Sequence, residues 1–249
     1  MSVTLPTTEL HTPNDLFRQR LWLACIWAWP LCIVIFGLSF VVLAGFLPPP
    51  PESASAADIA AFYAANRTTI RAGLIGALFA SALLLPFFTV VSAEMRKIEG
   101  RNPLLAPIQF GGAVILTAFF QIICIFWLLA SFRPEANPEI IRAFNDYGWL
   151  VWTMLIPTYS LQFICMGIAG FMDTRDHPIW PRWSAYLNIW VAFIGAGGVL
   201  AVYLKTGPFS WNGIIGIWLP VAFFAIGMSV NAWLLGRRAQ FEFAHPAET

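Results

Sequence analysis

Six runs of apolar residues, each about 20 residues long, decide what this chain can fold into. A helix of about 20 residues crosses a hydrocarbon core of about 30 Å, so each run is long enough to span a membrane. Charged residues make up only 11% of the 249 residues, too few to cover a water-facing surface, so lipid has to cover most of the chain. The expected spans are residues 22–46, 71–93, 106–130, 148–171, 184–204 and 213–236, between polar tails at 1–21 and 237–249.

The runs predict helices rather than barrel strands. None of them alternates strictly between apolar and polar residues, and an open sheet in lipid would leave backbone groups without hydrogen-bond partners. The first run is longer than the apolar core of a signal peptide, which is about 7 to 15 residues, so we expect an uncleaved anchor. The sequence therefore predicts an all-α fold, a single polytopic bundle of six transmembrane helices over residues 1–249.

The distribution of positive charge indicates the orientation of the bundle, because cytoplasmic loops carry an excess of Lys and Arg. With the N-terminus inside, nine of the 14 Lys and Arg residues lie on the inner side and five on the outer side. We therefore expect both termini in the cytoplasm. The inner nine are Arg18, Arg20, Arg96, Lys97, Arg101, Arg175, Arg182, Arg237 and Arg238, and the outer five are Arg67, Arg71, Arg133, Arg142 and Lys205.

Two outer loops carry signals for the start of a helix. Ser55 and Asp58 form a Ser-x-x-Asp capping pattern after the spacer Pro48–Pro51, at the head of "DIAAFYAANRTTIRAG". Asn137 followed by Pro138 is a second start and opens "EIIRAFNDYGW". We expect a short interfacial helix in each of these loops.

The placement of histidine and cysteine argues against a metal centre in the membrane. Haem, di-iron and copper sites at depth use histidine ligands, and no expected span contains a histidine. We therefore expect no bound cofactor. A net charge of +1 without a polybasic tail also gives no reason to expect a nucleic-acid partner. The histidines are His11, His177 and His245, and the cysteines, all in spans and expected to be free thiols, are Cys25, Cys32, Cys124 and Cys165.

The stretch "FMDTRDHPIWPRW", residues 171–183, holds the densest charge in the chain. Asp173, Asp176 and His177 offer two carboxylates and an imidazole, which would suit a metal or catalytic site. The alternative is a charged cytoplasmic turn. We favour the turn because it also accounts for the two arginines as topogenic charges and for the flanking tryptophans as an interfacial belt.

Six polar residues are candidates for a ligand-binding site. Five of them lie near the inner ends of their spans, and a sixth, Gln162, lies deeper beside Pro157. Polar groups in lipid are costly unless they face one another or water, so residues at one level suggest a shared vestibule. The alternative is that span ends are simply more polar, because side chains there reach the headgroups. The six candidates are Glu94, Gln109, Gln162, Asp173, Asn188 and Asn231.

Proline and small residues indicate kinks and close packing. Pro86, Pro157 and Pro220 each remove a helix hydrogen bond, so we expect the second, fourth and sixth spans to kink. Small residues recur every four positions over 73–81, which predicts a close helix contact, either inside the bundle or between copies of the chain.

Three segments, "AAFYAANRTTIRAG", "WPRWSAYLNIW" and "KTGPFSWNG", resemble segments of small uncharacterised bacterial integral membrane proteins of similar length. The resemblance implies a location in a bacterial inner membrane. It implies no activity and no catalytic residue.

Three functions fit these features. The first is binding or transport of a small, mostly apolar molecule within the bundle, with Glu94 and Asp173 as proton or cation sites. The second is an accessory or scaffolding subunit that packs against the helices of a partner subunit or of another copy of the chain. The third is a membrane enzyme acting on a lipid-like substrate, with Glu94 or Asp173 as general acid or base. We favour the first, with the lipid bilayer and a small apolar ligand as partners, over an enzyme.

Overall fold

The structure is a computed structural model that describes residues 13–133 and 135–244. All regular structure in these residues is helical, which confirms the predicted all-α fold class. The elements are α1 (Pro13–Gly37), η1 (Leu38–Leu43), α2 (Ala56–Ala65), α3 (Arg67–Ser81), α4 (Leu84–Glu99), α5 (Leu105–Phe132), α6 (Pro138–Met154), α7 (Ile156–Met172), α8 (Arg182–Ile194), η2 (Gly195–Val202), η3 (Ile214–Trp218) and α9 (Leu219–Ala244).

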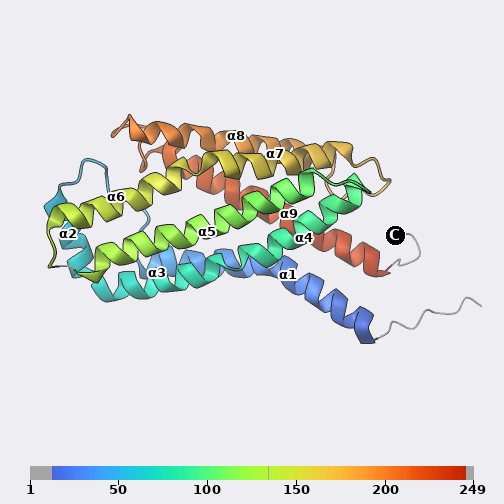
Figure 1. The fold of residues 1–249 in the computed structure, drawn as a ribbon, viewed down its shortest axis with the longest axis horizontal. Coiled ribbons are helices and arrows are strands. Elements are labelled where there is room, and N and C mark those ends of the chain that lie inside the picture. The colour runs from blue at the N-terminus through green and yellow to red at the C-terminus, as the bar shows by residue number, and fades with distance from the viewer. Residues whose placement is uncertain (1–12, 134, 245–249) are drawn as a thin grey trace, which may run out of the picture.

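Within the described residues, six helical segments are long and apolar enough to cross a membrane, and each coincides with a predicted apolar run. The protein is therefore a multi-pass membrane protein. The start of α1 and the end of α9 lie at the same end of the bundle (Figure 1), here called the terminal end, and α2 lies at the opposite loop end. The spans are Leu16–Leu43, Arg67–Glu99, Leu105–Phe132, Pro138–Met172, Arg182–Val202 and Ile214–Phe243.

The spans form a ring in the order of the sequence. Each span contacts the next one along the chain, and the sixth returns to contact the first through α1 and α9. Short connections between consecutive spans favour antiparallel neighbours, which explains this order. The centre of the ring is therefore bordered by several spans at once.

All spans except the third are interrupted in the described structure. The first changes from α-helix to π-helix at Leu38, the fifth changes to 3₁₀-helix at Gly195, and the sixth changes from π-helix to α-helix at Leu219. The second span breaks between Ser81 and Leu84, and the fourth breaks at Leu155. Only α5 crosses as one continuous α-helix.

Proline explains three of these interruptions. Pro86, Pro157 and Pro220 each lie in the first turn of the helix that follows a break, in α4, α7 and α9. A proline is tolerated there, because the N–H group that it lacks has no partner inside the helix at that position. The predicted kinks of the second, fourth and sixth spans are thus found.

The capping signals at the loop end are confirmed, but one of the two expected interfacial helices is not a separate element. Ser55 Oγ accepts a hydrogen bond from the N–H of Asp58 at 3.2 Å and caps α2. Asn137 Oδ1 accepts one from the N–H of Glu139 at 2.9 Å and caps α6. The prediction of a separate short helix after Asn137 was wrong. In the structure α6 continues without a break to Met154 and forms the first half of the fourth span.

Small residues pack the spans together within one chain. A side chain at Gly73 would meet the backbone carbonyl of Ser39 at 2.4 Å, so the second span lies directly against the π-helical part of the first. Gly198 similarly faces the carbonyl oxygen of Thr153 on the fourth span. The small-residue pattern over 73–81 therefore serves packing inside the bundle.

The buried apolar residues fall into two clusters along the bundle. The terminal half contains Trp29, Phe87, Phe163 and Trp180. The loop half is built mainly of large aromatic rings, which are Phe40, Phe46, Tyr63, Trp127, Trp149 and Trp211.

Candidate functional site

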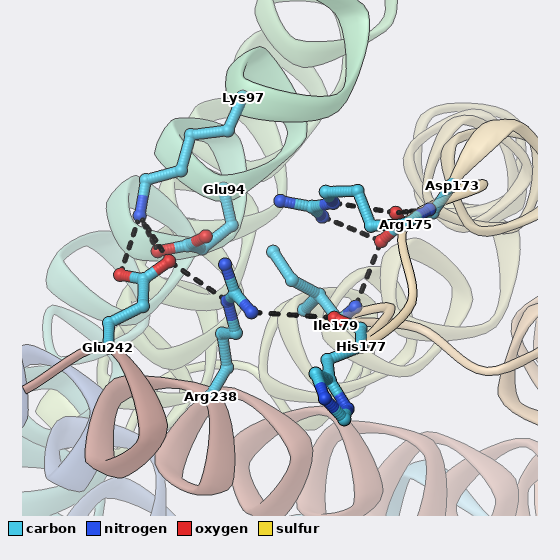
Figure 2. Close-up of polar contacts among 8 residues, drawn as sticks. All are labelled: Glu94, Lys97, Asp173, Arg175, His177, Ile179, Arg238 and Glu242. Carbon is cyan, nitrogen blue, oxygen red and sulfur yellow. Dashed lines mark hydrogen bonds and ion pairs between the residues drawn. The ribbon is translucent and has the colours of Figure 1, made fainter. Parts of the chain in front are cut away.

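The terminal end carries a network of ion pairs between α4 and α9 (Figure 2). Glu94 is buried on α4, and its Oε1 accepts a hydrogen bond from Lys97 Nζ at 2.8 Å. Lys97 also bonds Glu242 on α9 at 2.9 Å, and Arg238 Nε donates to the same carboxylate at 2.9 Å. The network neutralises Glu94 with a neighbouring cation and ties the second span to the sixth.

Asp173 organises the turn that follows α7. Its side chain is fully buried and accepts two hydrogen bonds from Arg175, at 2.7 and 2.6 Å, and one from the N–H of Ile179 at 2.9 Å. Burial alone would raise the pKa of Asp173, but the hydrogen bonds from Arg175 and Ile179 outweigh it and hold the pKa below its ordinary value. The carboxylate therefore stays charged and fixes the shape of the turn.

Asp176 and His177, the other members of the predicted metal or catalytic set, lie on the same turn and are exposed. The imidazole of His177 lies against the ring of Phe241, with ring centroids 4.9 Å apart. Among the described residues, no group of three His, Cys, Asp or Glu side chains is close enough to hold a metal ion. The arrangement of the turn fits the charged-turn interpretation.

Asn188 and Asn231 face each other across α8 and α9. Asn231 Nδ2 donates to Asn188 Oδ1 at 2.8 Å, and Asn188 Nδ2 donates back to Asn231 Oδ1 at 3.3 Å. Trp180 Nε1 also donates to Asn231 Oδ1, at 2.7 Å. Each amide donates in addition to a carbonyl of its own helix, Ser184 or Gly227, so all four side-chain amide atoms have partners.

Gln109 and Gln162 are also fully buried, on α5 and α7, but neither amide atom of either side chain has a hydrogen-bond partner in the described structure. Gln162 lies at a close contact between these helices, because a Cβ at Gly112 would be 3.2 Å from its own Cβ. A buried amide without a hydrogen-bond partner lowers the free energy of unfolding by about 1 to 3 kcal/mol. These two side chains are thus buried amides without partners, and the indole N–H of Trp149 is likewise buried without one in the described part of the chain.

The six predicted site residues therefore form several groups. Asn188 and Asn231 bond each other, Glu94 and Asp173 enter separate ion pairs, and the two glutamines make no hydrogen bonds. Their roles in ligand binding stay predictions.

A cavity of about 220 Å³ lies in the centre of the ring, and the predicted residues do not line it. Its walls come from the first, second, third, fourth and sixth spans. Most of the wall is aromatic or aliphatic. The aromatic lining residues are Trp29, Phe36, Phe40, Phe120, Trp152, Tyr159 and Phe224.

The rings hold one another in place around the cavity. Phe120 meets Trp152 edge-on, with centroids 5.3 Å apart, and Phe36 meets Phe120 edge-on at 5.8 Å. Trp29 and Phe224 form a third edge-on pair at 5.7 Å. Edge-to-face contacts orient the rings and fix their faces and edges as a preformed surface.

The three hydroxyl groups in the lining already have hydrogen-bond partners. The hydroxyl of Tyr159 donates to the carbonyl of Val191 at 3.0 Å, and Ser81 Oγ donates to the carbonyl of Leu78 at 2.7 Å. Thr153 Oγ1 likewise donates within its own helix, to the carbonyl of Leu150 at 3.1 Å. Since the lining residues include no charged side chain, the cavity offers apolar contact and little else.

The interruptions of the spans converge on this cavity. Gly37, Ser81 and Leu155 line it at the interruptions of the first, second and fourth spans, and Gly216 and Pro220 line it on either side of the change at Leu219 in the sixth span. Irregular backbone at membrane depth is tolerated where it is buried in protein or lines a cavity, and π-helical turns are frequent at functional sites. The helix breaks and the cavity therefore form one feature.

The loop after η1 and two partly exposed residues of the first span also border the cavity. Leu47 lines it from the loop after η1, and Trp211 holds that loop by donating its Nε1–H to the carbonyl of Pro50 at 2.8 Å and its backbone N–H to Glu52. Ile33 and Val41 on the first span line the cavity yet remain 37% and 39% exposed. These two side chains therefore contribute both to the cavity lining and to the exposed surface of the bundle.

Comparison with protein-family models, with curated proteins and with solved structures gave no match to this chain.

Proposed function

We propose that this protein binds a small, uncharged, apolar molecule in the aromatic cavity at the centre of the bundle. The observation that carries the proposal is the preformed cavity of about 220 Å³, which has no charged lining side chain and whose three hydroxyl groups are already hydrogen-bonded. A charged ligand would lose its hydration there without gaining a partner, whereas an apolar one loses nothing. The lining thus favours apolar ligands by chemistry alone.

The size of the cavity restricts the ligand further. An apolar protein cavity of about 150 Å³ is enough to hold benzene. A cavity of about 220 Å³ suits one or two fused rings, or the end of a branched hydrocarbon chain. The edges and faces of Phe120, Trp152 and Phe224 favour planar molecules.

The partial exposure of two lining residues on the first span favours uptake of the ligand from the bilayer. Ile33 and Val41 border both the cavity and the lipid-facing surface, so a molecule dissolved in the membrane reaches the cavity without crossing water. We extend the proposal to transport, because half-helices separated by breaks are the elements that rearrange in carriers with a site at the middle of the membrane.

The test uses two glycine positions with open space around them. A side chain at Gly37 would meet nothing within 4 Å, and Gly37 lines the cavity, so Gly37→Leu places a side chain at the cavity without a clash. Gly111, on α5, is equally open but lies outside the lining, so Gly111→Leu is the matched control. Naphthalene is the probe, with naphthalenesulfonate as its charged analogue.

We expect the unmodified protein and Gly111→Leu to bind naphthalene equally above the detergent background in equilibrium dialysis. Gly37→Leu should bind it about tenfold more weakly. The sulfonate should not bind. Equal binding of naphthalene by all three proteins, or equal binding of both probes, would refute the proposal.

For the location, we propose a bacterial inner membrane with the terminal end in the cytoplasm. The excess of Lys and Arg at that end, nine against five, supports this orientation, and the resemblance noted above supports the membrane. Tags fused before Met1 and after Thr249 should both be protected in intact cells and both be accessible in inverted vesicles. Accessibility of either tag from outside intact cells contradicts the orientation.

A further inference from the structure

A second cavity, of about 200 Å³, lies at the terminal end between the turn after α7 and the last turns of α9. Its apolar wall includes Ile179 and Leu234, which are buried, and Phe241. The rest of the lining is Arg237, Arg238, His177, Pro178 and Pro181. An apolar wall beside cationic groups at the end of a membrane span is the surface that the headgroup region of a lipid requires.

Both charged side chains in the lining are arginines, and both can reach an anion. Arg238 uses Nε on Glu242 and Nη1 on the carbonyl of His177 (Figure 2), which leaves further N–H donors of its five. Arg237 is exposed and lies over the ring of Trp233, with its guanidinium carbon 5.0 Å from the ring centroid. A planar guanidinium held on a ring is oriented for bidentate contact with phosphate oxygens.

The nearby carboxylates are already shared with other cations. Glu242 bonds Lys97 as well as Arg238, and Asp173 bonds Arg175. Asp176 is exposed on the adjacent turn and does not line the cavity. Arg237 therefore lines the cavity without an ion pair to any carboxylate of the described residues.

The position of the cavity relates it to the membrane surface. Trp233, one helical turn before Arg237, is 53% exposed although it belongs to the sixth span, as expected of a tryptophan in the interfacial aromatic belt. A headgroup phosphate lies at that level, and the glycerol and first acyl carbons lie just below it. On α9, Leu234 lies one helical turn nearer to the membrane than Arg237 and Arg238, which is the same order.

We propose that this cavity binds the phosphodiester headgroup of an anionic membrane lipid. The phosphate contacts Arg237 and the remaining donors of Arg238, and the glycerol and upper acyl carbons contact Ile179 and Leu234. This inference does not depend on the ligand of the central cavity.

The test compares Arg237→Gln with Arg101→Gln, an exposed arginine at the same end of the bundle that does not line the cavity. Each protein is reconstituted with equal amounts of phosphatidylglycerol and phosphatidylcholine and then extracted in mild detergent. Lipid that remains bound is counted by native mass spectrometry. Arg237→Lys tests whether charge alone is sufficient.

We expect the unmodified protein and Arg101→Gln to retain phosphatidylglycerol in preference to phosphatidylcholine. Arg237→Gln should weaken that retention about fivefold, and Arg237→Lys should weaken it less, because one juxtamembrane cation contributes roughly that factor. Equal retention of the two lipids, or an equal loss in Arg101→Gln, would overturn the proposal. Displacement of phosphatidylglycerol by inorganic phosphate would instead assign the site to a free anion and overturn the lipid assignment.

Discussion

The loop half and the terminal half of the bundle are held together by different interactions. In the loop half, large rings contact one another directly, as Trp127 does with Trp149 and Phe46, with centroids 4.7 and 5.0 Å apart. In the terminal half, spans are joined by polar side chains, such as Asn231 with Trp180 and Lys97 with Glu242. The departures from α-helical geometry, η1, η2 and η3, all lie in the loop half.

The difference shows what each kind of contact demands of the backbone. A hydrogen bond between two amides needs a fixed register and distance, so α8 and α9 are regular where Asn188 and Asn231 meet. Ring packing is less directional and accommodates a change of helix type. The central cavity lies where the two halves meet, because Trp29 and Tyr159 of the terminal cluster and Phe40 and Trp152 of the loop half all line it.

The largest expected effect is the loss of a ring from the loop half. Trp127→Ala removes a buried side chain that contacts Phe46 and Trp149 and donates to the carbonyl of Asn145 at 3.2 Å. We expect the free energy of unfolding to fall by about 3 to 5 kcal/mol, measured by far-UV circular dichroism during unfolding in SDS. Trp190→Ala is the control, because Trp190 is 64% exposed to the surroundings of the bundle. A similar effect of the two substitutions would show that ring packing does not hold this half.

In the terminal half, Asn231→Leu should lower the free energy of unfolding by about 2 to 3 kcal/mol. The substitution leaves Trp180 Nε1 and the amide of Asn188 without their partner. The double variant Asn188→Leu/Asn231→Leu should lose less than the sum of the two single variants, because it removes both amides of the pair. Additive losses would mean that the two amides are not coupled.

The spans, helix caps and helix breaks could largely be predicted from the sequence. The spans were predictable because apolar length is a local property, and so were the caps at Ser55 and Asn137 and the breaks near Pro157 and Pro220. The start of the fourth span was placed ten residues late, at 148 instead of Pro138, because "EIIRAFNDYGW" is polar enough to resemble a separate interfacial helix.

The partners of the buried groups and the walls of the cavity could not be predicted. In lipid the outward face of a helix is as apolar as its inward face, so periodicity does not reveal its rotation about its own axis. Trp152 and Trp190 look alike in the sequence, yet one lines the cavity and the other faces outward. Asn188 and Asn231 were predicted to lie at the same depth in the membrane. Their pairing could not be predicted, because it depends on the rotation of α8 and α9 about their own axes.

The turn after α7 is tested by lowering the pH. At neutral pH the carboxylate of Asp173 should contribute about 1 kcal/mol to the free energy of unfolding, because its partner Arg175 is partly exposed. The pKa of Asp173 in the folded protein lies below its ordinary value of 3.8, so its contribution is present above that value. It is lost as the pH falls through the lower folded pKa. Asp173→Asn should reduce the slope of stability against pH below about 4. An unchanged slope would show that Asp173 does not hold the turn.

The smallest expected effect is a gain in stability instead of a loss. Gln162→Leu replaces a buried amide that has no hydrogen-bond partner by an apolar side chain of similar size, so the free energy of unfolding should stay constant or rise by up to about 1 kcal/mol. The contrast with Asn231→Leu separates satisfied from unsatisfied buried amides within one bundle. Because Gln162 does not line the central cavity, naphthalene binding should also be unchanged. A loss of stability comparable to that of Asn231→Leu would show that the amide of Gln162 has a partner. A loss of naphthalene binding without a loss of stability would show that Gln162 belongs to the ligand site, as the sequence predicted.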